Sequence, residues 1–279
     1  MDALVSTQWL AGELGAADLR VVDATWFLEA GRDAAAEYET AHIPGAVFMD
    51  LANVADDKSE LPMMLPKPEK FASRMQSLGL GDGSRIVLYD NSPLKTAARA
   101  WWMLHLFGAH SVAILDGGFA KWTGEDRPVA TGKETLRHRH FTVWKDNAFV
   151  RTLDQMKALL DSKAEQIVDA RSQPRFEGRE AEPRLGVHPG HMPGAKNLPM
   201  SALFDSDGTY KSKDELRAAF AAADVDPMAP IAATCGSGVT AATVAFAAHL
   251  LGNDAVAVYD GSWSEWGAHP DTAKAIGAA

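Results

Sequence analysis

The sequence predicts an α/β protein made of two tandem copies of one domain, each a mainly parallel sheet flanked by helices. Short apolar runs typical of buried strands alternate with runs of helical spacing. The same order of motifs then occurs twice along the 279 residues. Matching residues lie 144 positions apart in three pairs: Gly108 and Gly252, Asp116 and Asp260, Trp122 and Trp266. A fixed offset across such different residue types indicates an internal repeat.

Six elements, four strands and two helices, are predicted in the first copy. Strands are expected at residues 19–24, 47–49, 85–89 and 111–115, and helices at residues 69–78 and 96–107. A turn, Ala41-His42-Ile43-Pro44-Gly45-Ala46, leads into the second of these strands. Both helices are followed by glycine, a common helix stop.

The second copy repeats this order. Strands are expected at residues 167–170 and 230–233 and helices at residues 214–222 and 242–251, with the turn Gly190-His191-Met192-Pro193-Gly194-Ala195. The predicted domains are residues 1–130 and 151–279, joined by a linker at residues 131–150. The linker has a strand-like stretch at residues 141–144 and an Arg/His cluster at residues 137–140. That cluster is either an anion site or, as we expect, a solvated surface.

Composition limits the function classes. A formal net charge of −10 argues against nucleic acid or an anionic membrane as a partner, although a small anionic substrate responds to local charge. One cysteine excludes an intrachain disulfide framework and a cysteine zinc site. The histidines are scattered, so no metal and no cofactor is expected. Neither a signal peptide nor an apolar run of about 20 residues is seen, and we expect a cytoplasmic protein.

The only cysteine stands in the run Thr234-Cys235-Gly236-Ser237-Gly238-Val239-Thr240-Ala241. The layout is a strand, a tight glycine loop and the start of a helix. Such a loop directs backbone N–H groups into one small space, to which the first helical turn adds its own. A lone cysteine is often a buried small hydrophobe. At the mouth of an anion-binding loop, we instead expect Cys235 to react as a thiolate.

The first copy lacks this thiol. The residue 144 positions before Cys235 is Asn91, in the run Asp90-Asn91-Ser92-Pro93-Leu94-Lys95-Thr96. The first domain is therefore predicted to be non-catalytic and to close one side of the site, since clefts between domains commonly bind small molecules.

Two chemistries use a thiolate in such a loop. Phosphate-ester chemistry uses the pattern Cys-x5-Arg, in which the arginine holds the phosphate. The sixth residue after Cys235 is Ala241, so a phosphatase is not expected. The other chemistry is attack on a donor's sulfur, which leaves a persulfide. The same N–H groups would then stabilise the starting thiolate and the persulfide anion.

Together, the repeat, the two His-x-Pro-Gly turns and the run from Cys235 to Ala241 resemble the tandem-rhodanese sulfurtransferases, and within them the 3-mercaptopyruvate branch. The resemblance covers nearly the whole chain and implies two rhodanese-like domains. It implies that Ser237 takes part in catalysis and that the rest of the loop contacts substrate, namely Gly236, Gly238, Val239 and Thr240.

The resemblance also implies a carboxylate clamp. The branch pattern Arg-Phe-x-Gly followed by Glu-Pro-Arg maps onto Arg175 and Arg184 as the substrate-binding pair, with Glu182 orienting one of them. Arg171 and Arg179, in the same run, are weaker candidates. Lys95 and Arg99 are further candidates in the first domain, where Lys95 stands at a position that is often aromatic.

Two positions depart from the family pattern. Family members commonly carry an aspartate and a histidine that are proposed to form a relay with the loop serine. Here Ala52 and Met63 occupy these positions, and neither side chain transfers a proton. We expect lower turnover but the same reaction class.

The resulting prediction is a sulfurtransferase that moves sulfur from 3-mercaptopyruvate through a Cys235 persulfide to an acceptor and releases pyruvate. The acceptor would be thioredoxin, glutathione or another thiol, or cyanide. Two alternatives remain: the same chemistry with thiosulfate as donor, and a non-enzymatic sulfur carrier.

Overall fold

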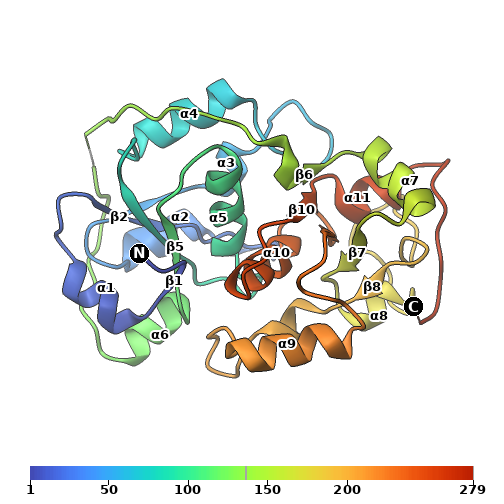
Figure 1. Cartoon of the computed structure of the whole chain (residues 1–279). Coiled ribbons are helices and arrows are strands. Elements are labelled where there is room, and N and C mark those ends of the chain that lie inside the picture. The colour runs from blue at the N-terminus through green and yellow to red at the C-terminus, as the bar shows by residue number, and fades with distance from the viewer. Residues whose placement is uncertain (136, 279) are drawn as a thin grey trace. The chain divides into compact units, whose positions relative to one another are not determined.

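The structure is a computed structural model that describes residues 1–135 and 137–278. The chain forms two compact units (Figure 1), which we describe separately. The first unit comprises Met1–Asp57, Leu65–Asp146 and Asp205–Tyr210, and the second comprises Lys58–Met64, Asn147–Phe204 and Lys211–Ala279.

The first unit contains a five-stranded parallel sheet of order β1-β5-β4-β2-β3. Its strands are β1 (Leu4–Val5), β2 (Leu19–Asp23), β3 (Ala46–Phe48), β4 (Arg85–Tyr89) and β5 (Val112–Leu115). Its helices are α1 (Thr7–Glu13), α2 (Ala34–Thr40), α3 (Leu51–Val54), α4 (Pro68–Ser77), α5 (Ala97–Leu106) and α6 (Gly118–Gly124).

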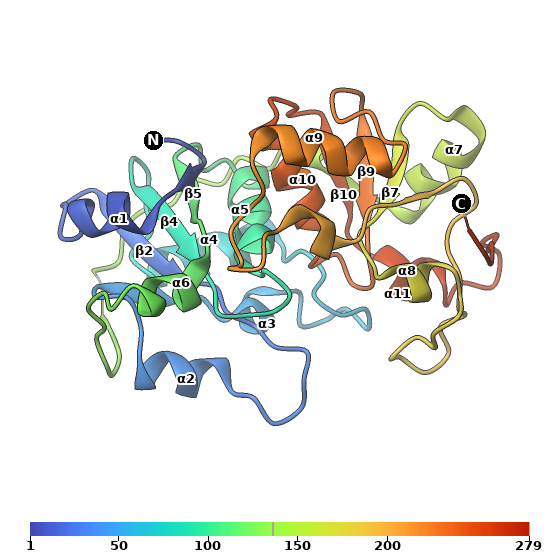
Figure 2. The same ribbon diagram turned by 90° about the horizontal axis from the view of Figure 1, so that it is seen from below.

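The second unit has the same topology, a five-stranded parallel sheet of order β6-β10-β9-β7-β8. Its strands are β6 (Val150–Arg151), β7 (Gln166–Asp169), β8 (Lys196–Asn197), β9 (Ile231–Thr234) and β10 (Val256–Tyr259). Its helices are α7 (Leu153–Ser162), α8 (Gln173–Phe176), α9 (Lys213–Ala222), α10 (Ala241–Leu250) and α11 (Ser262–Trp266), with 3₁₀ turns η1 (Asn147–Phe149) and η2 (Met200–Leu203). Figure 2 shows α9 and α10 on one side of this sheet and α8 and α11 on the other.

The alternation of side chains along each strand explains why helices cover both faces of each sheet. In the first unit, alternate residues of three strands share one core cluster with Leu10 of α1 and Trp122 of α6. In the second unit, Ile167, Ala232 and Tyr259 share a cluster with Trp263 and Trp266 of α11, among others. Successive strand residues point to opposite faces, so helices are needed on both sides of each sheet.

The His-x-Pro-Gly turns are structural in both units. His42 is buried, stacks on Tyr38 and contacts its carbonyl oxygen through Nδ1 at 2.9 Å. His191 does the same with Phe176, also at 2.9 Å. This matched burial supports a packing role for both histidines.

The predicted α/β class and the repeated parallel sheets are confirmed, and most expected elements lie within one or two residues of their predicted bounds. Two differences stand out. Strand β10 was missed, although its counterpart β5 had been expected, and β10 forms an inner position of the second sheet. Residues 141–144 do not form a strand: Phe141 is buried and Thr142 bonds to Asp82, so this part of the linker packs on the first unit.

Candidate active site in the second unit

Cys235 directly follows β9 and lies at the carboxyl end of the second sheet, where parallel α/β sheets commonly place their sites. Its side chain is buried, with 2% of the residue exposed. The loop that follows turns sharply into α10, and Gly238 takes a φ of +76° that favours glycine. The sequence pattern therefore produces the expected arrangement of strand, tight loop and helix.

The first turn of α11 holds the start of the loop. The amide of Cys235 donates to Ser262 Oγ at 3.2 Å, and that hydroxyl donates to the carbonyl of Tyr259 at 2.8 Å. The carbonyl of Gly236 accepts both the amide and the hydroxyl of Ser264, at 2.9 and 2.6 Å. Ser262 is buried with a φ of +49°, an uncommon conformation for a non-glycine residue. The backbone on both sides of the thiol is thus fixed by residues of α11.

Further along the loop, backbone donors are available. In residues 1–135 and 137–278, no carbonyl or side chain accepts a hydrogen bond from the amides of Gly236, Ser237 or Val239. Ser237 is half-buried, as is Gly236. Unpaired N–H groups next to a buried thiol favour an anion in this loop.

The corresponding loop of the first unit shows what such a loop accepts. There Asp90 directs its own carboxylate to the amides of Ser92 and Ala97, at 2.9 and 2.8 Å. Burial raises the pKa of this carboxyl group, and these two hydrogen bonds oppose the rise. The first loop therefore supplies its own anion from the chain, at the start of α5.

The loops after β4 and β9 can be matched residue by residue in two ways. Counting from the helices α5 and α10, the counterpart of Cys235 is Asn91. The backbone hydrogen bonds give a different match. The amide of Phe119 donates to the carbonyl of Asp90, and the amide of its counterpart Trp263 donates to the carbonyl of Cys235, so by this criterion Cys235 corresponds to Asp90. The loop of the first unit is one residue longer, which accounts for the difference. Neither match places a thiol in the first unit.

A buried ionic network lies beside the Cys235 loop. Arg171 is fully buried; its Nη2 pairs with Asp169 at 2.7 Å and its Nη1 with Glu182 at 2.7 Å. Its guanidinium also lies 4.6 Å from the ring centroid of Trp263. Burial alone would lower the pKa of Arg171, but the ion pairs with Asp169 and Glu182 outweigh this and raise it. Arg171 is therefore occupied within the protein and is held as a cation.

Glu182 extends this network to Arg175. The second oxygen of Glu182 accepts from Arg175 Nη2 at 2.5 Å. A side chain added at Gly236 would begin only 3.2 Å from that same nitrogen. The Arg175 guanidinium thus lies directly against the residue after Cys235, and Gly236 leaves room for it. Arg175 Nε is buried without a hydrogen-bond partner in the described chain.

Arg184 has no such partner. It is half-buried in the irregular segment after Glu182, and within the described residues it forms no ion pair or hydrogen bond. Burial lowers the pKa of its guanidinium. A partly desolvated arginine without a counter-ion suits an anionic ligand.

The other candidates lie elsewhere in the chain. Lys95 belongs to the first unit, where Nζ donates to the carbonyl of Gly208 at 3.0 Å. Arg99 is fully buried on α5 and lies 4.4 Å from the ring centroid of Trp102. Ala52 lies on α3 of the first unit, whereas Met63 groups with the second and takes a φ of +57°.

Comparison with known proteins agrees with this architecture. The sequence model described as "Rhodanese-like domain" matches the chain twice, at residues 6–125 and 152–269. The chain belongs to the rhodanese family.

Several relatives span almost the whole chain. Human 3-mercaptopyruvate sulfurtransferase is 44% identical over 271 residues, covering 95% of this chain and 91% of the relative. A thiosulfate sulfurtransferase of Cricetulus griseus is 43% identical over 272 residues, with the same coverage. The crystal structure of SseA from Escherichia coli, a 3-mercaptopyruvate sulfotransferase, superposes with a TM-score of 0.86 at 37% identity, covering 94% of this chain and 99% of SseA.

Within this rhodanese fold, sequence reasoning missed Ser262 and Ser264. The repeat offset could have pointed to Ser262, because its counterpart is Gly118, also at positive φ. A serine at a position where the other copy has a glycine in the left-handed conformation indicates that the serine side chain has a functional or structural role. Sequence reasoning also gave Arg171 little weight, although it is the most buried arginine of its segment.

None of the helices among the described residues has the length and apolar content needed to cross a bilayer. Nor do the side chains of residues 1–135 and 137–278 include a group of three or more His, Cys, Asp or Glu placed to hold a metal ion.

Proposed function

We propose that this rhodanese is a 3-mercaptopyruvate sulfurtransferase with Cys235 as nucleophile. The observation that carries the proposal is the Arg175 guanidinium, which Glu182 holds against Gly236, the residue that follows the thiol. A cation fixed beside a thiol suits a substrate that carries both a carboxylate and a sulfur. Arg184, with no counter-ion in the described chain, would complete the clamp on the α-keto acid.

The reaction proceeds in two halves. The Cys235 thiolate attacks the sulfur of 3-mercaptopyruvate; the new S–S bond forms as the C–S bond breaks, and its electron pair leaves as pyruvate enolate. A proton converts the enolate to pyruvate. An acceptor thiolate or cyanide then attacks the outer sulfur of the persulfide and releases the Cys235 thiolate, so the kinetics are ping-pong.

The loop supports the persulfide intermediate. The amides of Gly236, Ser237 and Val239, which have no acceptor among the described residues, are donors for the anionic outer sulfur, as the first unit's loop donates to the Asp90 carboxylate. Thr240, at the N-cap of α10, and Gly238, at the bend, shape this loop. With Ala52 and Met63 at the relay positions, water or Ser237 would deliver the proton to the enolate.

Mass spectrometry tests the proposal. After incubation with 3-mercaptopyruvate, the peptide containing Cys235 should be heavier by one sulfur atom, and a Cys235→Ser variant should show no such adduct. An unmodified Cys235 with both mercaptopyruvate and thiosulfate would contradict the proposal and favour a non-enzymatic role. The adduct also requires a free thiol, which persists in a reducing compartment such as the cytoplasm.

Thiosulfate remains a second candidate donor, because relatives with that name are nearly as similar to this chain. The ratio of kcat/KM for the two donors distinguishes them. Replacing Arg184 by alanine should lower kcat/KM for mercaptopyruvate more than for thiosulfate. Equal losses would favour thiosulfate. The acceptor is to be found by comparing thioredoxin, glutathione and cyanide in the second half-reaction.

The domain roles form part of the same proposal. The catalytic domain is residues 151–279, and residues 1–130 form a domain that lacks the nucleophile.

A further inference from the structure

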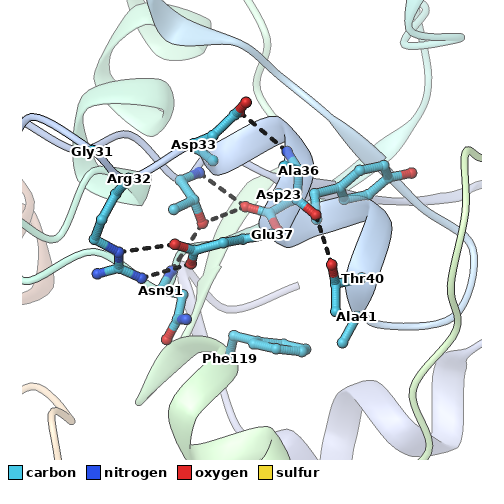
Figure 3. Close-up of a pocket in the computed structure, with 13 residues that line it drawn as sticks. Asp23, Gly31, Arg32, Asp33, Ala36, Glu37, Thr40, Ala41, Asn91 and Phe119 are labelled. Carbon is cyan, nitrogen blue, oxygen red and sulfur yellow. Dashed lines mark hydrogen bonds and ion pairs between the residues drawn. The ribbon is translucent and has the colours of Figure 1, made fainter.

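The first unit contains a cavity of about 460 Å³ near the carboxyl end of β2 and the start of α2. Figure 3 shows Asp23, Asn91 and Phe119 around it, with the pair Arg32–Glu37 to one side. Thr25 and Ala41 also line the cavity. Its volume falls in the range of about 300–1,000 Å³ typical of small-molecule sites.

The repeat identifies what fills the same place in the second unit. Asp23 and Asp169 end the matching strands β2 and β7, and Thr25 and Arg171 follow two residues later. Phe119 and Trp263 match at the fixed offset, because each donates its amide to the loop at the end of the central strand. Ala41 and Gly190 each precede the histidine of a His-x-Pro-Gly turn.

In the second unit, one guanidinium joins these positions. Arg171 pairs with Asp169, donates to the carbonyl of Gly190 at 2.8 Å and lies over the Trp263 ring. In the first unit the short side chain of Thr25 replaces that arginine. The carboxylate, the aromatic ring and the backbone position are retained, but no side chain of residues 1–135 and 137–278 supplies the cation.

Asp23 consequently lacks a counter-ion. The residue is 5% exposed, its Oδ1 accepts from the amide and the hydroxyl of Thr25, and within the described residues it forms no ion pair. Burial raises its pKa to about 6, and hydrogen bonding with Thr25 and with the Tyr89 side chain partly offsets the rise. The nearby Arg32 is already held by two bonds to Glu37, at 2.9 and 2.6 Å, and lies over Phe27.

We propose that this cavity binds a small organic cation with a planar guanidinium or amidinium group, with Asp23 as counter-ion and the Phe119 ring as the face on which it stacks. A planar fork of N–H donors matches a carboxylate in two places and stacks on aromatic rings, whereas an ammonium does neither as well. Asp33 and Glu37 add negative charge to the wall against the single cation Arg32. The inference stands independently of the reaction proposed for Cys235.

Titration of the full chain with benzamidine, followed by amide NMR spectra, tests the proposal. We expect saturable shifts at residues 23–25, 31–41, 91 and 119, and weaker binding of benzylamine, which has an ammonium in place of the amidinium. Shifts confined to the second unit, or no saturable shift, would overturn the proposal. So would equal binding of benzylamine.

Two variants and a control sharpen the test. Asp23→Asn keeps the oxygen that accepts from Thr25 and should weaken benzamidine binding about 10- to 100-fold. Thr25→Arg supplies the missing guanidinium from the chain and should abolish binding. Asp18→Asn changes the net charge equally, away from the cavity lining, and should leave the affinity unchanged.

Thermal melting checks that each variant is folded. If Thr25→Arg does not fold, Phe119→Leu replaces it and should weaken benzamidine more than benzylamine, because only the amidinium stacks on the ring. Wild-type affinity in a folded Asp23→Asn variant would refute the role of this carboxylate.

Discussion

Glu182 is the residue whose replacement tests the site most sharply, because one carboxylate holds two arginines. Its side chain is 4% exposed, and it lies 2.7 Å from Arg171 Nη1 and 2.5 Å from Arg175 Nη2. Glu182→Gln removes the charge between two guanidinium groups, and its amide nitrogen cannot accept from either. Removing one partner of a buried ion pair costs about 3–5 kcal/mol of unfolding free energy. Since Asp169 still pairs with Arg171, we expect the lower end, about 3 kcal/mol.

The catalytic effect should appear mainly in substrate binding. Arg175 has Glu182 as its only ion-pair partner in the described chain and would lose its position against Gly236. We expect KM for 3-mercaptopyruvate to rise about tenfold, which corresponds to ~1.4 kcal/mol, with a smaller change in kcat. Steady-state kinetics with both donors and urea denaturation provide the measurements.

A matched control comes from the same segment. Glu177 pairs with the exposed Arg179 at 2.5 Å, so Glu177→Gln should lower the stability much less than Glu182→Gln and should leave KM unchanged. Glu182→Asp retains the charge and should recover part of both losses. Equal effects of Glu182→Gln and Glu177→Gln would refute this role of Glu182, as would a Glu182→Gln variant that lowers kcat while KM stays constant.

Three further predictions follow from single side chains. Ser262→Ala removes the acceptor for the Cys235 amide and keeps a non-glycine residue at positive φ, whereas Ser262→Gly removes the same acceptor and relieves the backbone strain. Both variants should slow persulfide formation. The glycine variant should be more stable than the alanine variant by about 1 kcal/mol. Wild-type rates of persulfide formation in both variants would contradict this role. Arg184→Ala should raise KM for mercaptopyruvate at least about tenfold, while Arg179→Ala, in a surface pair, should not; equal effects in steady-state kinetics would remove Arg184 from the clamp. The pKa of Asp23, about 6 in the folded chain against 3.8 as its ordinary value, means that this group destabilises the fold as pH rises from 4 through 6. Asp23→Asn should therefore gain up to about 3 kcal/mol at pH 7.5 and little at pH 4 by urea denaturation; the same gain at both pH values would refute the assignment.

Local patterns were sufficient for much of the fold. The helices α5 and α10 lie 144 residues apart and were read from their apolar content and the glycine after each. The local residue pattern also identified the loop of Cys235, because a strand, a glycine turn and a helix start can each be recognised from neighbouring residues. Strand β10 was missed because its four residues are short and apolar, which does not distinguish a strand from other buried segments.

The sequence alone determined the fold class, the repeat and the one thiol, since each depends on neighbours in the chain or on a fixed spacing. Tertiary structure decided which groups support that thiol. Ser262 reaches the Cys235 amide from 27 residues away, and Glu182 joins Arg171 and Arg175 across a charged run whose composition is that of an ordinary loop. Only the fold showed that Asp23 has no cationic partner among the described residues, whereas its counterpart Asp169 pairs with Arg171. The physical reason is that parallel strands bring their carboxyl ends to one edge of the sheet, so the side chains that meet there come from distant parts of the sequence.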